Sequence, residues 1–344
     1  MLEGAEGVSG NPRRLIENRG IGYQGAIPLG AGFLIEEEVA SRWIKQDPKN
    51  AEVLFPYLNG DDVTSRFDTS PSRWVINFGS RSEAEAAQYS LPFAHVEATV
   101  KPERAKNSVR KRREIWWQFT GLVPELTRAC ESLEQVLVIP RVSKAVVPIR
   151  VSASQVFSNT LYVFASESYS LLALLSSSAH QLWAITHGAT MGLRISYTIS
   201  DVFETFVRPD SSKELAELGE LVSEERREVM MKRELGVTKL YNLVNSPSIS
   251  DSSDPDVAKI RSLQVSLDYA VARAYGWTDI PLEHGFYTYR QVERWTVGPA
   301  ARAQILGRLL EENHRRSAVE TAGAPAKGNG KRAKASRLNE EGLF

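Results

Sequence analysis

The chain has 344 residues, with 42 Lys and Arg against 42 Asp and Glu, 42% hydrophobic residues and one cysteine. This is the composition of a globular protein, and at ~150 residues per domain the length favours two domains. A single cysteine excludes a disulfide framework and cysteine-based zinc or iron–sulfur sites, and the spacing of the five histidines matches no metal-binding motif. The most apolar run, residues 169–185, is interrupted too often by polar residues to span a membrane, so we expect a cytoplasmic protein without membrane contact.

Residues 1–20 are rich in Gly, Asn and Arg and have no hydrophobic period, which predicts a flexible leader. From residue 21 to residue 210, β-branched and aromatic runs alternate with amphipathic stretches. The predicted strands are residues 74–78, 135–142, 145–151 and 160–165, and the predicted helices are residues 36–45, 122–133 and 168–184. We therefore expect a first domain over residues 21–210, with a mixed or antiparallel sheet and flanking helices.

The second and third of these strands are separated only by Ser143 and Lys144, which predicts a hairpin with these two residues at its tip. Pro140 and Pro148 lie within the two strands. Because proline cannot donate a hydrogen bond to a neighbouring strand, we expect these strands at sheet edges or interrupted by bulges.

After residue 210 the pattern becomes that of a helical domain. Helices are predicted at residues 211–234, 254–275 and 299–316, the second with Gly276 as its C-cap. Residues 319–344 contain few large apolar side chains, which predicts a disordered tail. The fold class is therefore α+β, with the mixed or antiparallel sheet domain followed by a helical domain over residues 211–318.

The densest charge cluster is the 101–113 segment, which holds seven basic residues against one acidic residue, Glu103. Such a cationic run can neutralise DNA phosphates and release their counterions, and Trp116 and Trp117 just after it could pack on sugar or base. The candidate DNA-binding residues here are Lys101, Arg104, Lys106, Arg112 and Arg113. The alternative is a solvated charged surface, with the Trp pair in the hydrophobic core.

A second cluster, Arg141, Ser143 and Lys144, lies at the predicted hairpin tip. Arg or Lys bound to guanine O6 and N7 is the commonest specific base contact, and the hydroxyl of nearby Ser158 is a group that can bind phosphate. The alternative is an ordinary polar turn.

A third cluster lies in residues 187–201, where two glycines accompany Arg194 and Tyr197. These side chains are suited to hydrogen bonding and stacking. The alternative is a connecting loop in which Arg194 pairs with a carboxylate such as Asp201.

The sequence contains no motif for catalysis. It has no glycine-rich cofactor loop of the dinucleotide-binding type, no Asn-Pro-Pro-Tyr-type motif of adenine methylation, no phosphate loop and no nuclease carboxylate pattern. Asp61 and Asp62 follow Asn59-Gly60, and we interpret them as residues that shape a turn rather than metal ligands. We therefore expect no cofactor and no metal in this chain, and no catalysis by this chain alone.

Several longer stretches resemble a known family. They are residues 55–78 (FPYLNGDDVTSRFDTSPSRWVINF), 100–107 (VKPERAKN), 112–119 (RREIWWQF), 136–151 (VLVIPRVSKAVVPIRV) and 197–209 (YTISDVFETFVRP). These stretches are similar to the MmeI-like target-recognition domain of type IIG and IIL restriction-modification enzymes and of related adenine-specific DNA methyltransferases of phage-defence systems. Residues 236–245 (GVTKLYNLVN) resemble the helical domain that follows it, so the likeness covers about residues 23–316.

The resemblance implies a module that recognises double-stranded DNA, while a separate catalytic domain binds S-adenosylmethionine and methylates a flipped adenine. The sequence starts where recognition should begin, which suggests a truncated reading frame or one half of a split enzyme. By motif position the resemblance assigns DNA contacts to Arg141, Ser143, Lys144, Arg194 and Tyr197. The variable positions that help to select a base correspond to Met191 and Leu193, whose apolar side chains do not favour direct hydrogen bonds there.

Our leading hypothesis is therefore a sequence-specific module for double-stranded DNA that serves a methyltransferase domain or subunit, in cis or in trans. The first alternative is a protein-interaction module, in which residues 211–316 dock a methyltransferase or another defence subunit without touching DNA. The second is a catalytically inactive remnant.

Overall fold

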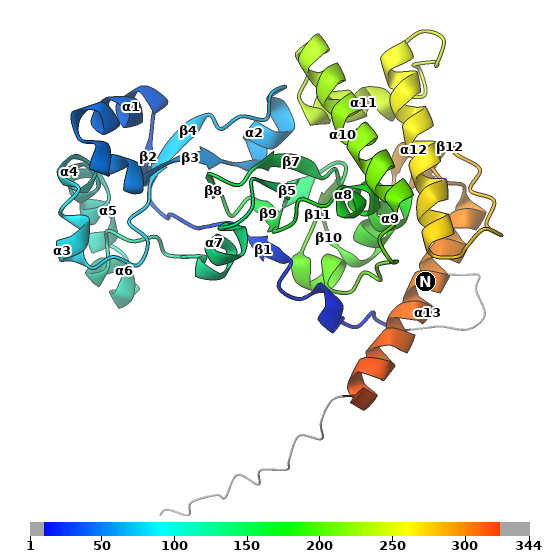
Figure 1. Ribbon diagram of the computed structural model, residues 1–344, viewed down its shortest axis with the longest axis horizontal. Helices are drawn as coiled ribbons and strands as arrows, with labels where there is room; N and C mark the ends of the chain where they lie inside the picture. Colours follow the sequence, from blue (N-terminus) through cyan, green and yellow to red (C-terminus); the bar gives the residue numbers. More distant parts are fainter. Residues whose placement is uncertain (1–9, 324–344) are drawn as a thin grey trace, which may run out of the picture.

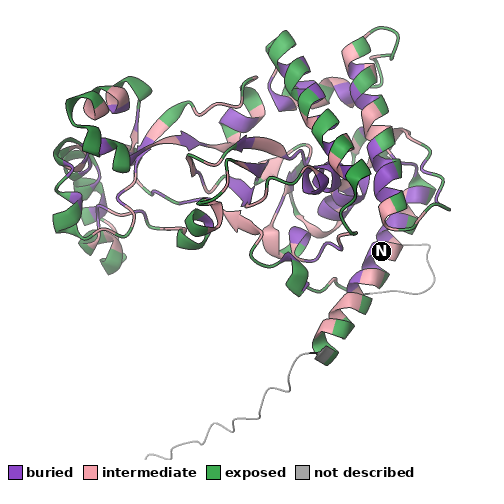
Figure 2. Cartoon of the chain, in the orientation of Figure 1, coloured by how far each residue is buried: buried purple, intermediate pink, exposed green. Residues whose placement is uncertain are grey.

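The computed structural model describes residues 10–323, with the side chains of Thr190 and Met191 excepted. Figure 1 shows a molecule with a lobe of short helices at one end, sheets in the middle and long helices at the other end. In Figure 2, buried residues concentrate in the central strands and in the helices packed next to them, whereas the lobe of short helices is largely exposed. The predicted α+β fold class is confirmed.

Two four-stranded sheets form the middle of the molecule. The first has the antiparallel order β1 (Gly22–Gln24), β9 (Leu161–Phe164), β5 (Gln135–Pro140) and β7 (Ile149–Ser152). The second has the order β2 (Leu34–Ile35), β4 (Arg73–Ile76), β3 (Leu54–Leu58) and β8 (Val156–Phe157), in which β3 and β8 run parallel. β5 and β9 consist mainly of aliphatic and aromatic residues and are buried along nearly their whole length, because they lie inside the first sheet. The strands predicted at residues 74–78, 135–142 and 160–165 are confirmed with shorter ends.

Two smaller sheets complete the set. One is three-stranded, in the order β10 (Ala189–Met191), β11 (Arg194–Ser196) and β6 (Val142–Ser143), and the other is the hairpin of β12 (Gly285–Tyr289) and β13 (Val292–Thr296). The second hairpin lies in the region for which only helices were predicted. The β-forming residues of its two strands, GFYTY and VERWT, are separated by only two residues, and this pattern would have predicted a hairpin.

The short helices cover the second sheet and the ends of the first. They are α1 (Glu37–Gln46), α2 (Gly60–Ser65), α3 (Glu83–Ala86), α4 (Ser90–Thr99), α5 (Lys101–Ala105), α6 (Arg110–Glu114) and α7 (Pro124–Cys130). Side-chain caps fix where α2 and α3 begin, since Asn59 and Ser82 each accept a hydrogen bond from the third residue of the helix. The helix predicted at residues 36–45 is confirmed as α1. Asp62 was interpreted as a residue that shapes a turn, and its side chain does complete the cap at the start of α2.

The remaining helices are α8 (Tyr169–Ser176), α9 (Ser178–His187), α10 (Lys213–Arg233), α11 (Val237–Val244), α12 (Pro255–Ala274) and α13 (Pro299–Gly323), of which α10, α12 and α13 are the long ones. The single helix predicted over residues 168–184 is wrong, because Ser177 leaves the helical region with ψ of 155° and caps α9 by accepting from the His180 amide. Gly276 follows α12 with φ of 74°, as a C-cap requires. Within residues 10–323, each helix is too short or too polar to span a lipid bilayer.

One hydrophobic core joins the regions before and after residue 210. It includes Leu137 and Phe164 of the first sheet, Trp183 of α9, Leu267 of α12 and Leu309 of α13, all fully buried. α10 approaches α8 closely because position 219 is glycine: a Cβ there would lie 2.0 Å from a backbone carbonyl oxygen of α8. The two predicted domains therefore share one hydrophobic core, which crosses their predicted boundary at residue 210.

Two predictions about the chain ends need correction. The leader was expected to be flexible, but Leu15 is fully buried, its amide donates to the Glu204 carbonyl at 2.7 Å, and the Asn18 amide group donates to the Phe206 carbonyl at 2.7 Å. These contacts hold residues 15–18 against the segment after β11. The hydrophobic period of the sequence cannot indicate them, because the partners are far apart along the chain. The tail was expected from residue 319, yet α13 continues to Gly323; residues 1–9 and 324–344 lie outside the described residues.

The predicted hairpin tip at Ser143 and Lys144 is also wrong. β5 and β7 do pair, with Val138 opposite Ile149 as the last pair, so the connection between them is long. Val142 and Ser143 within it form β6, which joins a different sheet. Pro140 ends β5 beyond its pairing with β7, so no hydrogen bond is lost there even though β5 is an inner strand.

Candidate nucleic-acid interface

The sheet β10–β11–β6 brings together the two polar clusters that the sequence keeps fifty residues apart. β6 pairs antiparallel with β11, with Ser143 opposite Ile195 and Val142 opposite Ser196. Lys144 directly follows β6 and Arg194 is the first residue of β11, so the two residues lie at the same end of this strand pair. Both side chains are exposed, and neither has a carboxylate within salt-bridge distance among the described residues. Like charges at one end of a strand pair repel each other, so an anion placed near both would be bound favourably.

A tight turn leads into Arg194. β10 and β11 are joined by Gly192 and Leu193, with Gly192 at φ of 62°. A glycine at the first of two turn positions matches a type II′ hairpin, whose twist suits antiparallel strands. Leu193 at the tip is 57% exposed, which is high for so large an apolar side chain. Of the two expected base-selecting positions, Leu193 is thus accessible, while the Met191 side chain lies outside the described residues.

Tyr197 does not have the expected role, because it is buried. Only 1% of the residue is exposed, its ring packs on Tyr162 and Phe164, and its hydroxyl lies 3.0 Å from His180 Nε2. His180 Nδ1 is 2.9 Å from the Leu175 carbonyl, which can only accept, and burial lowers the pKa of His180 to about 4. The neutral ring therefore donates from Nδ1 and accepts the Tyr197 proton at Nε2, and this pair anchors the end of β11 in the core.

Arg141 precedes β6, and Ser143 is its last residue. The Arg141 backbone donates to the Thr160 carbonyl and accepts from the Tyr197 amide, while its side chain is exposed. The half-buried Ser143 donates its hydroxyl proton to the Ala145 carbonyl at 2.7 Å. Arg141 is thus presented beside Lys144, whereas the Ser143 hydroxyl shapes the chain after β6.

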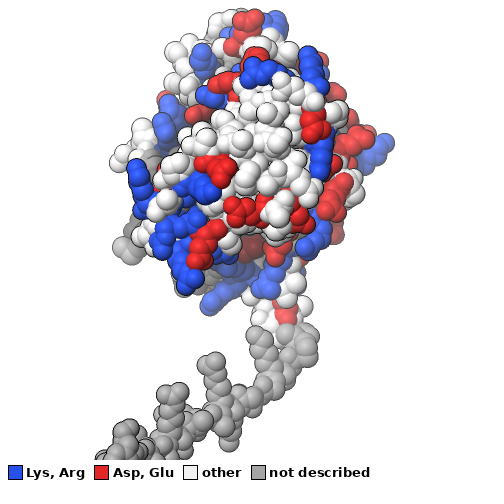
Figure 3. All heavy atoms as spheres, turned by 90° about the vertical axis from the view of Figure 1, so that its left-hand side faces the viewer, with Lys and Arg blue, Asp and Glu red and all other residues white. Residues whose placement is uncertain are grey.

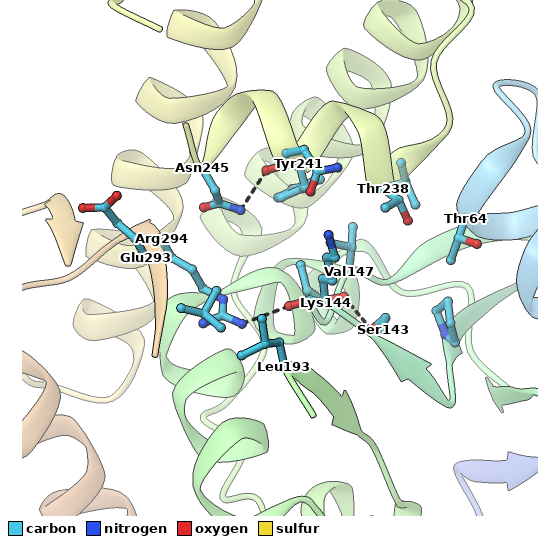
Figure 4. Close-up of a pocket in the computed structure, with 15 residues that line it drawn as sticks. Thr64, Ser143, Lys144, Val147, Leu193, Thr238, Tyr241, Asn245, Glu293 and Arg294 are labelled. Carbon is cyan, nitrogen blue, oxygen red and sulfur yellow. Dashed lines mark hydrogen bonds between the residues drawn. The ribbon is translucent and has the colours of Figure 1, made fainter. Parts of the chain in front are cut away.

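A cavity of about 220 Å³ opens behind this sheet, between β6, the β10–β11 turn, α11 and β13. Figure 4 shows Tyr241 and Asn245 on one side and Lys144, Leu193 and the Arg294 side chain on the other. Arg294 is 6% exposed and donates from Nη2 to the Lys144 carbonyl at 3.0 Å. This bond fixes the loop that carries Lys144 to the hairpin of the C-terminal region.

Arg104 and Ser158 are buried, which corrects two further predicted DNA contacts. The Arg104 guanidinium donates to the backbone carbonyls of Pro28, Leu29, Ile115 and Gln118, and burial lowers its pKa. Ser158 is 4% exposed, and its hydroxyl oxygen accepts from the Thr160 amide at 3.2 Å. Both residues hold loops in place and neither can reach DNA.

The two tryptophans after the basic segment also lie in the core. Trp116 and Trp117 are 4% and 8% exposed and meet edge to face. The alternative interpretation, a tryptophan pair in the hydrophobic core, is therefore correct for these residues. Stacking on DNA from this segment is excluded by their burial.

The remaining cations of the 101–113 segment lie on the surface of α5 and α6. Lys101 pairs with Glu97 at 2.7 Å, and Arg113 donates to the Asn107 carbonyl at 2.6 Å, while Lys106 is exposed and Arg112 half-buried. Figure 1 places α5 and α6 at the opposite end of the long axis from the hairpin β12–β13, well away from β10 and β11. Figure 3 looks onto this end, where Lys and Arg gather in the lower part beside acidic side chains. The predicted DNA-binding cations therefore form two separate surfaces.

Comparison with known proteins identifies the family. The family model described as MmeI, target recognition domain, matches residues 20–210, more than half of the chain. The chain belongs to this family. The resemblance seen in the sequence motifs is thereby confirmed, and the matched range ends where the first domain was predicted to end.

A solved structure has the same fold. It is the structure of the type IIL restriction-modification enzyme MmeI in complex with DNA, with a TM-score of 0.63 and 18% sequence identity over 92% of this chain. The match covers 38% of that MmeI chain, so this chain spans well under half of its length. It extends beyond residue 210, so the shared fold includes helices of the C-terminal region. Among curated protein sequences, none matches.

Proposed function

We propose that this chain binds double-stranded DNA and gives sequence specificity to an adenine-specific DNA methyltransferase of a restriction-modification or phage-defence system. The observation that carries the proposal is the exposed residues Lys144 and Arg194, held at the same end of the paired strands β6 and β11 of a target recognition domain, without an acidic partner among residues 10–323. The solved MmeI structure of the same fold is a DNA complex, which supports DNA as the ligand.

The β10–β11 hairpin is suited to base recognition. The major groove admits a two-stranded ribbon, and Arg and Lys bind guanine O6 and N7 there. Leu193 at the tip offers an apolar surface of the kind that contacts a thymine methyl group. Because Ile195 and Tyr197 are buried beneath the hairpin, Arg194 is presented from a fixed backbone, which favours specific contacts over diffuse attraction.

The cations on α5 and α6 are assigned a second role, contact with the phosphate backbone at a distance from the hairpin. Lys106, Arg112 and Arg113 are the residues assigned to this role: Lys106 and Arg113 are exposed and Arg112 is half-buried, whereas Arg104 is used inside the protein. Phosphate contacts position a protein on the duplex without reading its sequence. In this proposal the cations on α5 and α6 position the protein on the duplex, and the β10–β11 hairpin recognises the bases.

Catalysis and S-adenosylmethionine binding are assigned to a separate methyltransferase domain or subunit, in cis or in trans. The recognition surface described above is built from cations and backbone-anchored turns, which supply binding and orientation. In this proposal the chain itself needs no cofactor to bind DNA.

Selection from a randomised duplex library, followed by titration of the selected site over a range of salt, tests the proposal. We expect a defined recognition sequence and, from three phosphate contacts, a slope of log K against log salt of about −3 or steeper. Binding that does not depend on salt, or selection without sequence enrichment, would refute it.

A second candidate function is docking of a methyltransferase subunit through α10 and α12. Leu221 and Tyr269, each 41% exposed, lie on the two helices around one surface depression, and apolar residues exposed together favour a protein partner. Leu221→Glu should weaken association with the methyltransferase and leave DNA affinity unchanged. If docking is the main function, the wild-type chain will bind the subunit but show no salt-dependent affinity for DNA.

A further inference from the structure

The turn of the β12–β13 hairpin is formed by residues that are unusual for its backbone conformation. Tyr289 pairs with Val292, and the two residues between them, Arg290 and Gln291, have φ of 48° and 65°. Positive φ at both positions is the pattern of a type I′ turn, for which Asn-Gly or Asp-Gly is strongly preferred because bulkier side chains strain the backbone there. Stability alone does not explain why two long polar side chains occupy this turn.

The turn lies beside the proposed recognition hairpin. The Tyr289 hydroxyl is 3.2 Å from Thr186 Oγ1, and Arg290 Nη2 donates to the Thr186 carbonyl at 3.3 Å. Thr186 lies in the last turn of α9, and only His187 and Gly188 separate it from β10. The turn therefore stands at the base of the β10–β11 hairpin.

Three further observations place the β12–β13 hairpin against this sheet. Arg294 of β13 holds the Lys144 carbonyl, and Leu193 lines the same cavity as Val292 and Glu293. The Arg302 guanidinium of α13 lies 4.4 Å from the centre of the Tyr289 ring. Together these contacts hold the hairpin rigidly against the sheet β10–β11–β6, so the position of its turn relative to Lys144 is set by the fold.

Arg290 and Gln291 are both exposed, and little restrains their side chains. At 3.3 Å the solvent-exposed hydrogen bond from Arg290 to Thr186 is long for an N–H donor, so its release costs little. Arg bonds guanine and Gln bonds adenine through paired hydrogen bonds at the major-groove edge. The turn thus presents both of these side chains next to the surface assigned to DNA.

We propose that the Arg290–Gln291 turn is a second base-reading element, which extends the recognition surface beyond the matched residues 20–210 into the C-terminal region. This inference rests on the proposed function, since it needs DNA at the β10–β11 hairpin. It adds one or two base pairs to those read by Lys144 and Arg194, because two adjacent turn residues span no more than neighbouring base steps.

The test compares base preference and stability in one double variant. Arg290→Asn with Gln291→Gly replaces the turn by the preferred type I′ sequence, so the hairpin should be at least as stable and the melting temperature unchanged or raised. On the selected site we expect discrimination at one or two base pairs to fall about 5- to 100-fold, with the other positions unaffected. A variant with Arg227→Asn, on the exposed side of α10, makes the same charge change elsewhere and should leave base preference unaltered.

The conservative variant Arg290→Lys separates base reading from attraction to phosphate. Lys keeps the charge but cannot form the paired hydrogen bonds of a guanidinium, so we expect relaxed preference with the salt slope of the wild type. Unchanged base preference in the double variant, or an equal loss of affinity on every sequence, would overturn the inference. Wild-type protein that binds DNA specifically in the same experiment keeps the proposed function intact, whereas wild-type protein that does not bind overturns both.

Discussion

Arg104 provides a direct way to separate folding from DNA binding, because it lies in the most basic segment of the sequence but is 3% exposed. Arg104→Met keeps most of the aliphatic stem and removes the guanidinium. The carbonyls of Pro28, Leu29, Ile115 and Gln118 then lose their charged donor. We therefore expect the variant to lose stability rather than DNA contacts.

The size of the loss follows from these acceptors. A buried acceptor left without a donor costs about 1–3 kcal/mol, and partial access of water to some of the four carbonyls reduces the sum. We expect a decrease of about 3–5 kcal/mol in the free energy of unfolding, similar to the loss on breaking a buried charged contact. Since domains are stable by about 5–15 kcal/mol, the variant should still fold at low temperature.

Urea denaturation monitored by tryptophan fluorescence measures this loss, because Trp116 and Trp117 lie in the core beside the Arg104 site. Lys106→Met is the matched control on the same segment: its side chain is exposed, so stability should change by less than about 0.5 kcal/mol while the salt slope of DNA binding becomes shallower. The reasoning is refuted if Arg104→Met unfolds within about 1 kcal/mol of the wild type, or if it weakens DNA binding at unchanged stability.

Four further results are expected. Tyr197→Phe should lower the free energy of unfolding by about 1–2 kcal/mol, because His180 Nε2 loses its donor, and should leave base preference in a library selection unchanged. Lys144→Ala and Arg194→Ala should keep the wild-type denaturation midpoint but lose about 1–3 kcal/mol of discrimination at particular base pairs; a uniform loss on all sequences would contradict base reading. Burial lowers the pKa values of His180 and His187 from 6.5 to about 4, so protons favour the unfolded chain and stability present above pH 6.5 should fall toward pH 4, each histidine contributing at most about 1.4 kcal/mol per pH unit; a flat stability profile over this range would contradict their burial as neutral rings. Gly219→Ala should lower the melting temperature, because its Cβ would push α10 away from α8 at a cost of about 1–3 kcal/mol.

Local sequence patterns determined much of the secondary structure. β-branched and aromatic runs gave β4, β5 and β9, and the spacing of apolar residues gave α1, α10 and α12, because these patterns depend on neighbours within a few positions. The family motifs also lie in continuous stretches, so the target recognition domain could be identified from the sequence. The clusters of basic residues could also be found from the sequence, because their members are close neighbours along the chain.

Only the tertiary structure decided which basic side chains are exposed and available to bind DNA. Arg104 and Lys106 are two positions apart in one basic run, yet the first is buried among carbonyls and the second is exposed. Tyr197 and Arg194 lie on one strand segment, but the alternation of side chains puts Tyr197 against His180 in the core. Lys144 and Arg194 come to the same end of a strand pair because the chain leaves the first sheet after β5 and β6 pairs with β11, a contact across about fifty residues. Burial and long-range register are set by the packing of the whole chain, and a run of charged residues does not contain that information.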